Sequence, residues 1–244
     1  MRNKAIYRVF CFGIAVCGSI SLYAQNYSLD MSKIKAKYNS GDISFHVKYL
    51  FYPFDSIKKA TDSMNIQCNM SGNEYYYKIN AGVGSYEYLK NSRFYFVIDH
   101  SEKAIAVKKS SEAHQQLWDI NKIDSIMHSP SVKVKYKDLG KNEAEYEVTL
   151  ESGPWNRFKI VFNRTTYILE KMYMYSPGTG KMYGEDYKKP MIGIYYSNYS
   201  TAQFSKDIFN EGKFFSDTQS AIVLTDSYKK YKLLDYVYKM SKRS

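Results

Sequence analysis

The feature that most constrains this chain is a series of short segments in which apolar and polar residues alternate. Alternation with a period of two places every second side chain on one face of a β-strand. The clearest example covers residues 43–51, with its apolar positions at Ile43, Phe45, Val47, Tyr49 and Phe51. This predicted strand ends at Pro53, which has no amide hydrogen to donate to a neighbouring strand.

Turn residues separate successive segments of this kind, which predicts β-hairpins. Residues 64–70 and 73–80 flank Ser71-Gly72, and residues 94–99 and 103–108 flank a turn at His100. About ten short strands in hairpin order indicate an antiparallel sheet that must bury one face. Residues 176–190 are expected to be a loop, and residues 204–215 a short helix or loop. The other predicted strands are residues 132–136, 144–150, 157–162, 166–175, 191–199 and 228–238.

Helical spacing of apolar residues is clear in one segment. It predicts an amphipathic helix over residues 112–128, which ends before Pro130. Residues 27–41 fit either a short helix or a loop, with Leu29, Ile34 and Tyr38 at helical spacing. The predicted fold is therefore mainly β, of the α+β class. It is a curved antiparallel sheet or half-barrel with one main helix packed on or over it.

The N-terminus has the composition of a secretory signal peptide. Positive residues precede an uncharged, largely apolar run at 9–22, and small Ala24 precedes Gln25. We expect cleavage near Ala24-Gln25 and a single mature domain over 25–244, located in the periplasm, at the cell surface or outside the cell. The junction resembles export signals of Bacteroidetes. The alternatives are an uncleaved anchor, for which the run is short, and a lipoprotein signal at Cys17, where bulky Val16 does not fit. We expect no integral membrane protein.

Charge and cysteine content narrow the range of partners. The chain carries a net charge of +11, and removal of the signal leaves +8. The lysines are spread along the chain, which favours attraction to anionic surfaces over nucleic-acid binding. After cleavage only Cys68 remains, so no intramolecular disulfide can form, and its alternating context predicts a small buried strand residue.

Residue patterns that carry chemistry are missing from the sequence. It has no nucleophile elbow, zinc-ligand spacing or phosphate loop, so we predict no catalytic residues, no metal site and no cofactor. The four histidines share no local spacing. His46 should lie on the face opposite Phe45, and His100 should be solvated at a turn, while His114 and His128 flank the predicted helix.

The order of elements resembles the lipoprotein-carrier superfamily of Gram-negative envelopes, the LolA and LolB types. The resemblance rests on the long strand 43–51 after a short helical segment, the hairpin 94–108, the strands 157–162 and 166–175, and the late strand 190–199. It implies a curved sheet that holds a lipid or a lipoprotein acyl chain in its concavity. The residues expected to line that apolar face are Phe45, Val47, Tyr49, Phe96, Ile98, Phe158, Ile160 and Leu169.

Three other interpretations remain open. The same apolar side chains could fill a solid core. Tyrosines at 75–77 and 195–196, together with Trp155, could bind an envelope protein or a glycan through their rings. An envelope enzyme with scattered catalytic residues is the third interpretation.

Overall fold

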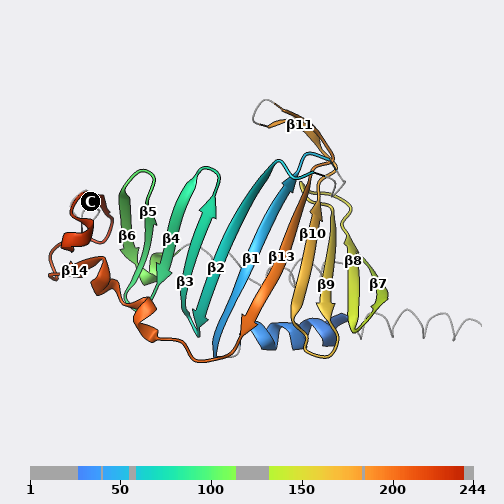
Figure 1. Cartoon of the computed structure of the whole chain (residues 1–244), viewed down its shortest axis with the longest axis horizontal. Helices are drawn as coiled ribbons and strands as arrows, with labels where there is room; N and C mark the ends of the chain where they lie inside the picture. Colours follow the sequence, from blue (N-terminus) through green and yellow to red (C-terminus); the bar gives the residue numbers. More distant parts are fainter. Residues whose placement is uncertain (1–26, 40, 55–58, 114–131, 183–184, 239–244) are drawn as a thin grey trace, which may run out of the picture. The chain divides into compact units, whose positions relative to one another are not determined.

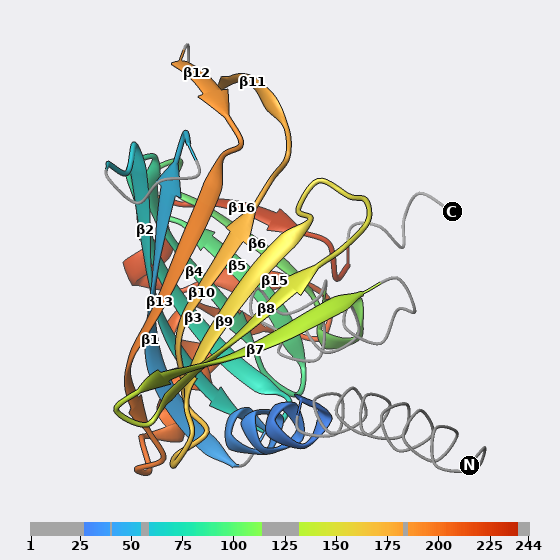
Figure 2. The same cartoon turned by 90° about the vertical axis from the view of Figure 1, so that its right-hand side faces the viewer.

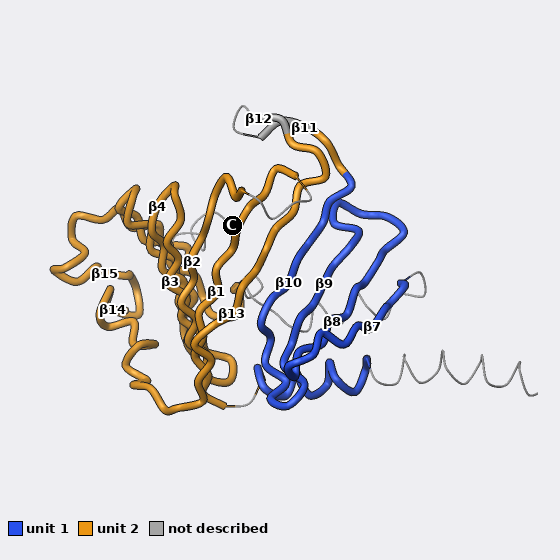
Figure 3. Tube along the Cα trace, turned by 45° about the vertical axis from the view of Figure 1, so that its right-hand side comes forward, with its two compact units in different colours: residues 1–38, 120–177 blue, residues 39–119, 178–244 orange. Residues whose placement is uncertain are grey.

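The computed structural model describes residues 27–39, 41–54, 59–113, 132–182 and 185–238. The predicted signal peptide lies outside the described residues. The chain divides into two compact units, coloured separately in Figure 3. Unit 1 contains residues 1–38 and 120–177, and unit 2 contains residues 39–119 and 178–244.

Unit 2 is built on eight neighbouring strands in the order β16-β6-β5-β4-β3-β2-β1-β13 (Figure 1). Every neighbouring pair is antiparallel except β16 with β6. Tight turns join the consecutive strands. Gly72 lies in one of them and has a φ of 57°, a conformation that glycine adopts without steric cost. The strands are β1 (Asp42–Tyr52), β2 (Asp62–Ser71), β3 (Glu74–Ala81), β4 (Gly84–Lys90), β5 (Phe94–Asp99), β6 (Ala104–Lys109), β13 (Met191–Ser200) and β16 (Lys232–Asp235).

The structure confirms most of the predicted strands of unit 2 and corrects three segments. β4 was not predicted, although Tyr86 and Tyr88 alternate with Ser85 and Glu87 as strand residues do. The expected strand at 228–238 is only the four residues of β16, preceded by a 3-10 turn at Asp226–Tyr228, and it runs parallel to β6. The expected loop at 176–190 contains a two-stranded hairpin of β11 (Thr179–Met182) and β12 (Glu185–Lys188).

Unit 1 contains four antiparallel strands in the order β10-β9-β8-β7. Lys141 and Asn142 both have positive φ, as the tight turn of a two-residue hairpin requires, and they join β7 to β8. The return strand of the next hairpin begins at Leu169 rather than at Thr166. The strands are β7 (Lys133–Gly140), β8 (Glu143–Thr149), β9 (Arg157–Asn163) and β10 (Leu169–Tyr175).

A helix over residues 27–38 lies across one end of the strands of unit 1 (Figure 2). Of the two states left open for this segment, the helix is therefore the one observed. The buried face of the helix carries Tyr27, Met31, Ile34 and Tyr38. Leu29, which the spacing placed on that face, is 53% exposed.

The helix predicted at 112–128 lies almost entirely outside the described residues. Glu112 ends a 3-10 turn that begins at Ser110. Among the residues that the structure describes, no helix is long and apolar enough to cross a membrane.

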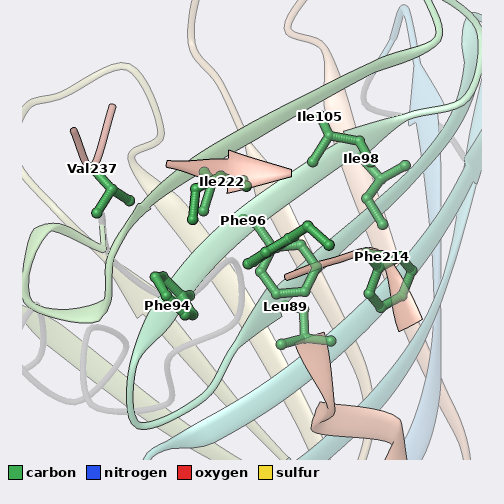
Figure 4. Packing of buried hydrophobic residues seen from close by; sticks show 10 residues of the cluster. Leu89, Phe94, Phe96, Ile98, Ile105, Phe214, Ile222 and Val237 are labelled. Carbon is green, nitrogen blue, oxygen red and sulfur yellow. The ribbon is translucent and has the colours of Figure 1, made fainter. Parts of the chain in front are cut away.

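The C-terminal segment, residues 205–238, packs against one face of β4, β5 and β6. It includes three 3-10 turns, Lys206–Phe209, Glu211–Lys213 and Asp226–Tyr228, a short hairpin of β14 (Phe215–Asp217) and β15 (Ile222–Leu224), and the edge strand β16. Figure 4 shows Phe214 and Ile222 packed against Leu89, Phe96 and Ile98. The fold is mainly β with a curved antiparallel sheet, as predicted.

Candidate functional site

The strand register sorts the side chains of unit 2 onto two faces of its sheet. Residues directly opposite each other on neighbouring strands point to the same side. We call the side that carries Phe45, Cys68 and Tyr77 the Phe45 face. The opposite side, which carries Leu89, Phe96 and Val107, is the Phe96 face.

One row of the Phe45 face is uncharged across seven strands. The register links one residue on each of β1, β2, β3, β4, β5, β6 and β16. The members on β1, β2 and β3 are buried, whereas the other four are half-buried. In strand order the row is Phe45, Cys68, Tyr77, Tyr88, Val97, Ala106 and Leu234.

The half-buried end of this row forms a shelf, which we define as Tyr88, Val97, Ala106 and Leu234. Small Ala106 lies between Val97 and Leu234. Burial raises the pKa of the Tyr88 phenol, with the neighbouring Tyr86 second in effect. The phenol therefore stays neutral near neutral pH and can donate a hydrogen bond from an otherwise apolar surface.

Lysine and tyrosine alternate in the neighbouring row of the same face. Lys90 lies opposite both Tyr75 and Tyr95, and Tyr95 lies opposite Lys108. The Lys90 ammonium is 6.0 Å from the centre of the Tyr75 ring, and the Lys108 ammonium is 5.4 Å from that of Tyr236. We call these five residues the lysine–tyrosine row.

The Phe96 face is filled where the C-terminal segment covers it. Phe96 and Ile98 are both 0% exposed. The ring of Phe215 meets Phe94 and Phe96 edge to face, at centroid distances of 5.4 and 5.1 Å. Phe96 and Ile98 therefore belong to a packed core, and the register places them on the side opposite Phe45.

A buried amide holds the start of the C-terminal segment. The Asn91 side chain donates to the Phe209 carbonyl at 3.1 Å and to Glu211 at 2.6 Å. Its oxygen accepts the backbone N–H groups of Arg93 and Phe94. All of the polar atoms of this side chain are therefore satisfied, as a buried amide requires.

His100 connects the sheet to the C-terminal segment. Its Nε2 lies 2.9 Å from the Glu87 carboxylate and its Nδ1 lies 2.9 Å from the Tyr231 hydroxyl. Tyr76 donates to the second oxygen of Glu87. The expectation of a solvated turn histidine was wrong, because both ring nitrogens have protein partners and the ring of Tyr231 meets the imidazole edge to face at 6.0 Å. Tyr231 is 131 positions away in the sequence, so no local pattern could indicate this contact.

The remaining predicted site residues lie in unit 1. Ile160 and Leu169 are buried, and Phe158 is half-buried. They point to the same side as Tyr146, whose hydroxyl donates to Asp30 of the helix at 2.7 Å. The structure thus divides the eight predicted residues into three groups: Phe45, Val47 and Tyr49 on the Phe45 face, Phe96 and Ile98 on the Phe96 face, and Phe158, Ile160 and Leu169 in unit 1.

Several other side chains that the sequence singled out have defined environments in the structure. Burial raises the pKa of the Cys68 thiol, which keeps it protonated, and raises the pKa of Tyr49 to about 12. His46 lies on the face opposite Phe45, as expected. Within the described ranges no three His, Cys, Asp or Glu side chains gather as a metal site would require.

Sequence reasoning missed the shelf. Val97, Ala106 and Leu234 are ordinary strand residues, and only the register brings them beside Tyr88. The sequence did contain one signal. In strand 94–99 both alternating sets contain apolar or aromatic residues, which indicates that both faces of β5 are covered to some degree.

Comparisons with known proteins concern the fold. No protein-family model and no curated protein matches the chain. Among solved structures, a LolA superfamily protein from Nitrosomonas europaea is similar, with 13% identity and a TM-score of 0.35. It covers 76% of this chain and 97% of that one. A protein of the superfamily that the order of elements resembles is thus among the similar solved structures.

Two further solved structures are similar over comparable lengths. A putative outer membrane lipoprotein-sorting protein domain from Vibrio parahaemolyticus has 8% identity and a TM-score of 0.34, covering 75% of this chain and 95% of that one. The MucA/MucB complex of Pseudomonas aeruginosa has 11% identity and a TM-score of 0.41, covering 82% of this chain and 64% of that one.

Proposed function

We propose that this protein is an exported, non-enzymatic envelope protein that binds a lipid, an acyl chain or another apolar ligand on the Phe45 face. The observation that supports the proposal is the row from Phe45 to Leu234, which stays uncharged across seven strands although its last four members are half-buried. An apolar ligand would cover the shelf and remove that surface from water.

The Phe96 face provides an internal comparison. Where the C-terminal segment does not cover it, its side chains are those expected of solvated strands, such as exposed His46, Gln67 and Lys78. The half-buried part of the Phe45 face carries Val97 and Leu234 instead. A surface that only met water would not need these residues, and a bound apolar molecule explains them.

Native mass spectrometry of residues 25–244, purified without detergent, tests the proposal, together with organic extraction of any bound molecule. We expect a stoichiometric lipid or acyl species that is lost in Val97→Asp. Val223→Asp is the matched control, because Val223 is 50% exposed on β15, outside the shelf. Ala106→Gln is a second shelf variant that fills the surface without placing a charge there.

A clean apo mass that persists after incubation with envelope lipids would count against the proposal. So would equal losses of ligand in Val97→Asp and Val223→Asp. Circular dichroism of each variant separates loss of binding from loss of folding.

A protein or glycan partner is the second candidate. It is supported by the half-buried rings of Tyr86, Tyr88 and Tyr95 on the same side of β4 and β5. Aromatic faces of this kind also stack on sugars and on partner side chains. Binding of a soluble glycan that Val97→Asp leaves intact and Tyr88→Ala abolishes would favour this candidate.

A further inference from the structure

We propose that the ligand of the Phe45 face is an anionic amphiphile, with its carboxylate or phosphate head in the lysine–tyrosine row and its apolar body on the shelf. This inference rests on the proposed function and adds the chemistry of the head group. The occupant is chosen by charge: two of the three lysines that the strand register places on this face, Lys90 and Lys108, share one row without a carboxylate, directly beside the uncharged row.

The register fixes the geometry of the head-group site. Lys90 and Lys108 flank Tyr95 on the strands to either side of it. Their backbones lie two strand spacings apart, or about 10 Å. Lysine side chains are long and flexible enough for both ammonium groups to reach one anion placed over Tyr95.

Half-buried Tyr95 contributes a neutral hydrogen-bond donor to this row. Burial raises the pKa of its phenol. The phenol therefore remains protonated at neutral pH, when a carboxylate or phosphate is charged. Tyr75 is only 2% exposed, and its part is to position Lys90. The Lys90 ammonium stands over the ring of Tyr75, which orients the cation before any ligand arrives.

The acidic side chain on this part of β5 lies at the other end of the strand. Asp99 also points to the Phe45 face, opposite Tyr86. It is four residues from Tyr95, or about 13 Å along the strand. The row of Asp99 also carries Lys232, opposite Ala104, so its charges are mixed, whereas the lysine–tyrosine row carries cations alone. This difference favours an anionic head over the lysine–tyrosine row.

The apolar body follows from the adjacent row. Val97 is two residues from Tyr95 and Ala106 is two residues from Lys108, each on the same face. A chain attached to a head group over Tyr95 meets Val97, Ala106 and Leu234 next. Free inorganic phosphate would meet only the cationic row and is expected to bind weakly.

The experiment compares four probes below their micelle concentrations by isothermal titration calorimetry with residues 25–244. The probes are dodecyl phosphate, neutral dodecyl maltoside, cationic dodecyltrimethylammonium and inorganic phosphate. We expect dodecyl phosphate to bind about tenfold more tightly than the maltoside, because hydrogen bonds to charged groups are the stronger kind. Added salt should weaken binding of the phosphate probe selectively.

Lys108→Gln is the test variant and Lys109→Gln is its matched control. Lys109 is adjacent, is exposed and loses the same charge, but it lies on the Phe96 face. We expect Lys108→Gln to reduce dodecyl phosphate affinity about tenfold and to leave the maltoside unchanged. Lys90→Gln should act in the same direction, and the double variant should bind both probes equally.

The outcomes separate the two proposals. If both dodecyl probes bind equally, or if Lys109→Gln acts like Lys108→Gln, the head-group inference is wrong while apolar binding stands. If inorganic phosphate binds as tightly as dodecyl phosphate, the site takes a free anion and the amphiphile inference is wrong. If no probe binds, the proposed function itself fails.

Discussion

Replacing Phe215 with alanine should detach the C-terminal segment from the sheet. Phe215 is fully buried and meets both Phe94 and Phe96 edge to face. Truncation of a buried phenylalanine to alanine lowers the free energy of unfolding by about 3–5 kcal/mol, because apolar burial is lost and a cavity remains. Each aromatic pair contributes about 0.5–1.5 kcal/mol in addition to the contribution of its buried apolar surface area.

The assay is urea unfolding followed by circular dichroism, with Val223→Ala as the control. Val223 lies on the paired strand of the same short hairpin, opposite Ser216, and is 50% exposed. Its truncation should change the free energy of unfolding by no more than about 0.5 kcal/mol. Phe215→Ala should lower that free energy by about 3–5 kcal/mol, which is a large share of the stability of an ordinary domain.

Hydrogen exchange locates the loss. If the segment opens before the rest of the sheet, protection should fall first at the amides of β16, which ends the strand order of the described sheet and pairs there with β6. Equal unfolding free energies for Phe215→Ala and Val223→Ala would refute the reasoning, since the cluster on the Phe96 face would then not hold the segment.

Two further predictions concern hydrogen-bonded carboxylates. Tyr238 donates to Asp217 at 2.7 Å, which together with Arg93 holds the pKa of that carboxyl below its ordinary value of 3.8. A lowered folded pKa stabilises the protein above the ordinary value. The original protein should therefore have a higher free energy of unfolding than Tyr238→Phe at neutral pH, and this difference should disappear as the pH falls below about 3.8. Unfolding titrations at several pH values measure it, and a difference that does not depend on pH would contradict the prediction. Tyr146→Phe removes the bond to Asp30 and should lower the free energy of unfolding by about 1 kcal/mol, whereas an unchanged unfolding midpoint would argue against that bond.

The longer strands were mostly predictable because each depends on a local pattern. The alternation from Ile43 to Phe51 appears in the structure as β1, and the hairpin around His100 appears as β5 and β6. The helix over 27–38 could only be left as one of two alternatives. Its exposed Leu29 shows why: a helical spacing is not unique when polar residues lie between its members.

The position of the site was not predictable from the sequence, because alternation does not tell which set of side chains meets the core. In β1 the buried set includes Phe45, whereas in β5 it includes Phe96, and the register places these on opposite faces. A local pattern contains no record of cross-strand pairing, and the contact between His100 and Tyr231 joins residues 131 positions apart.

The C-terminal segment explains how one sheet can bury different faces along its width. Without it, Phe96 and its neighbours would be exposed, and β4, β5 and β6 would have to bury their Phe96 face elsewhere. With it in place, these three strands are already stabilised from one side, and the side chains of their other face are not needed for a core. Val97 and Ala106 are then available for a ligand at little cost in stability. Variants of the shelf should therefore change binding more than folding, whereas variants under the C-terminal segment should do the reverse.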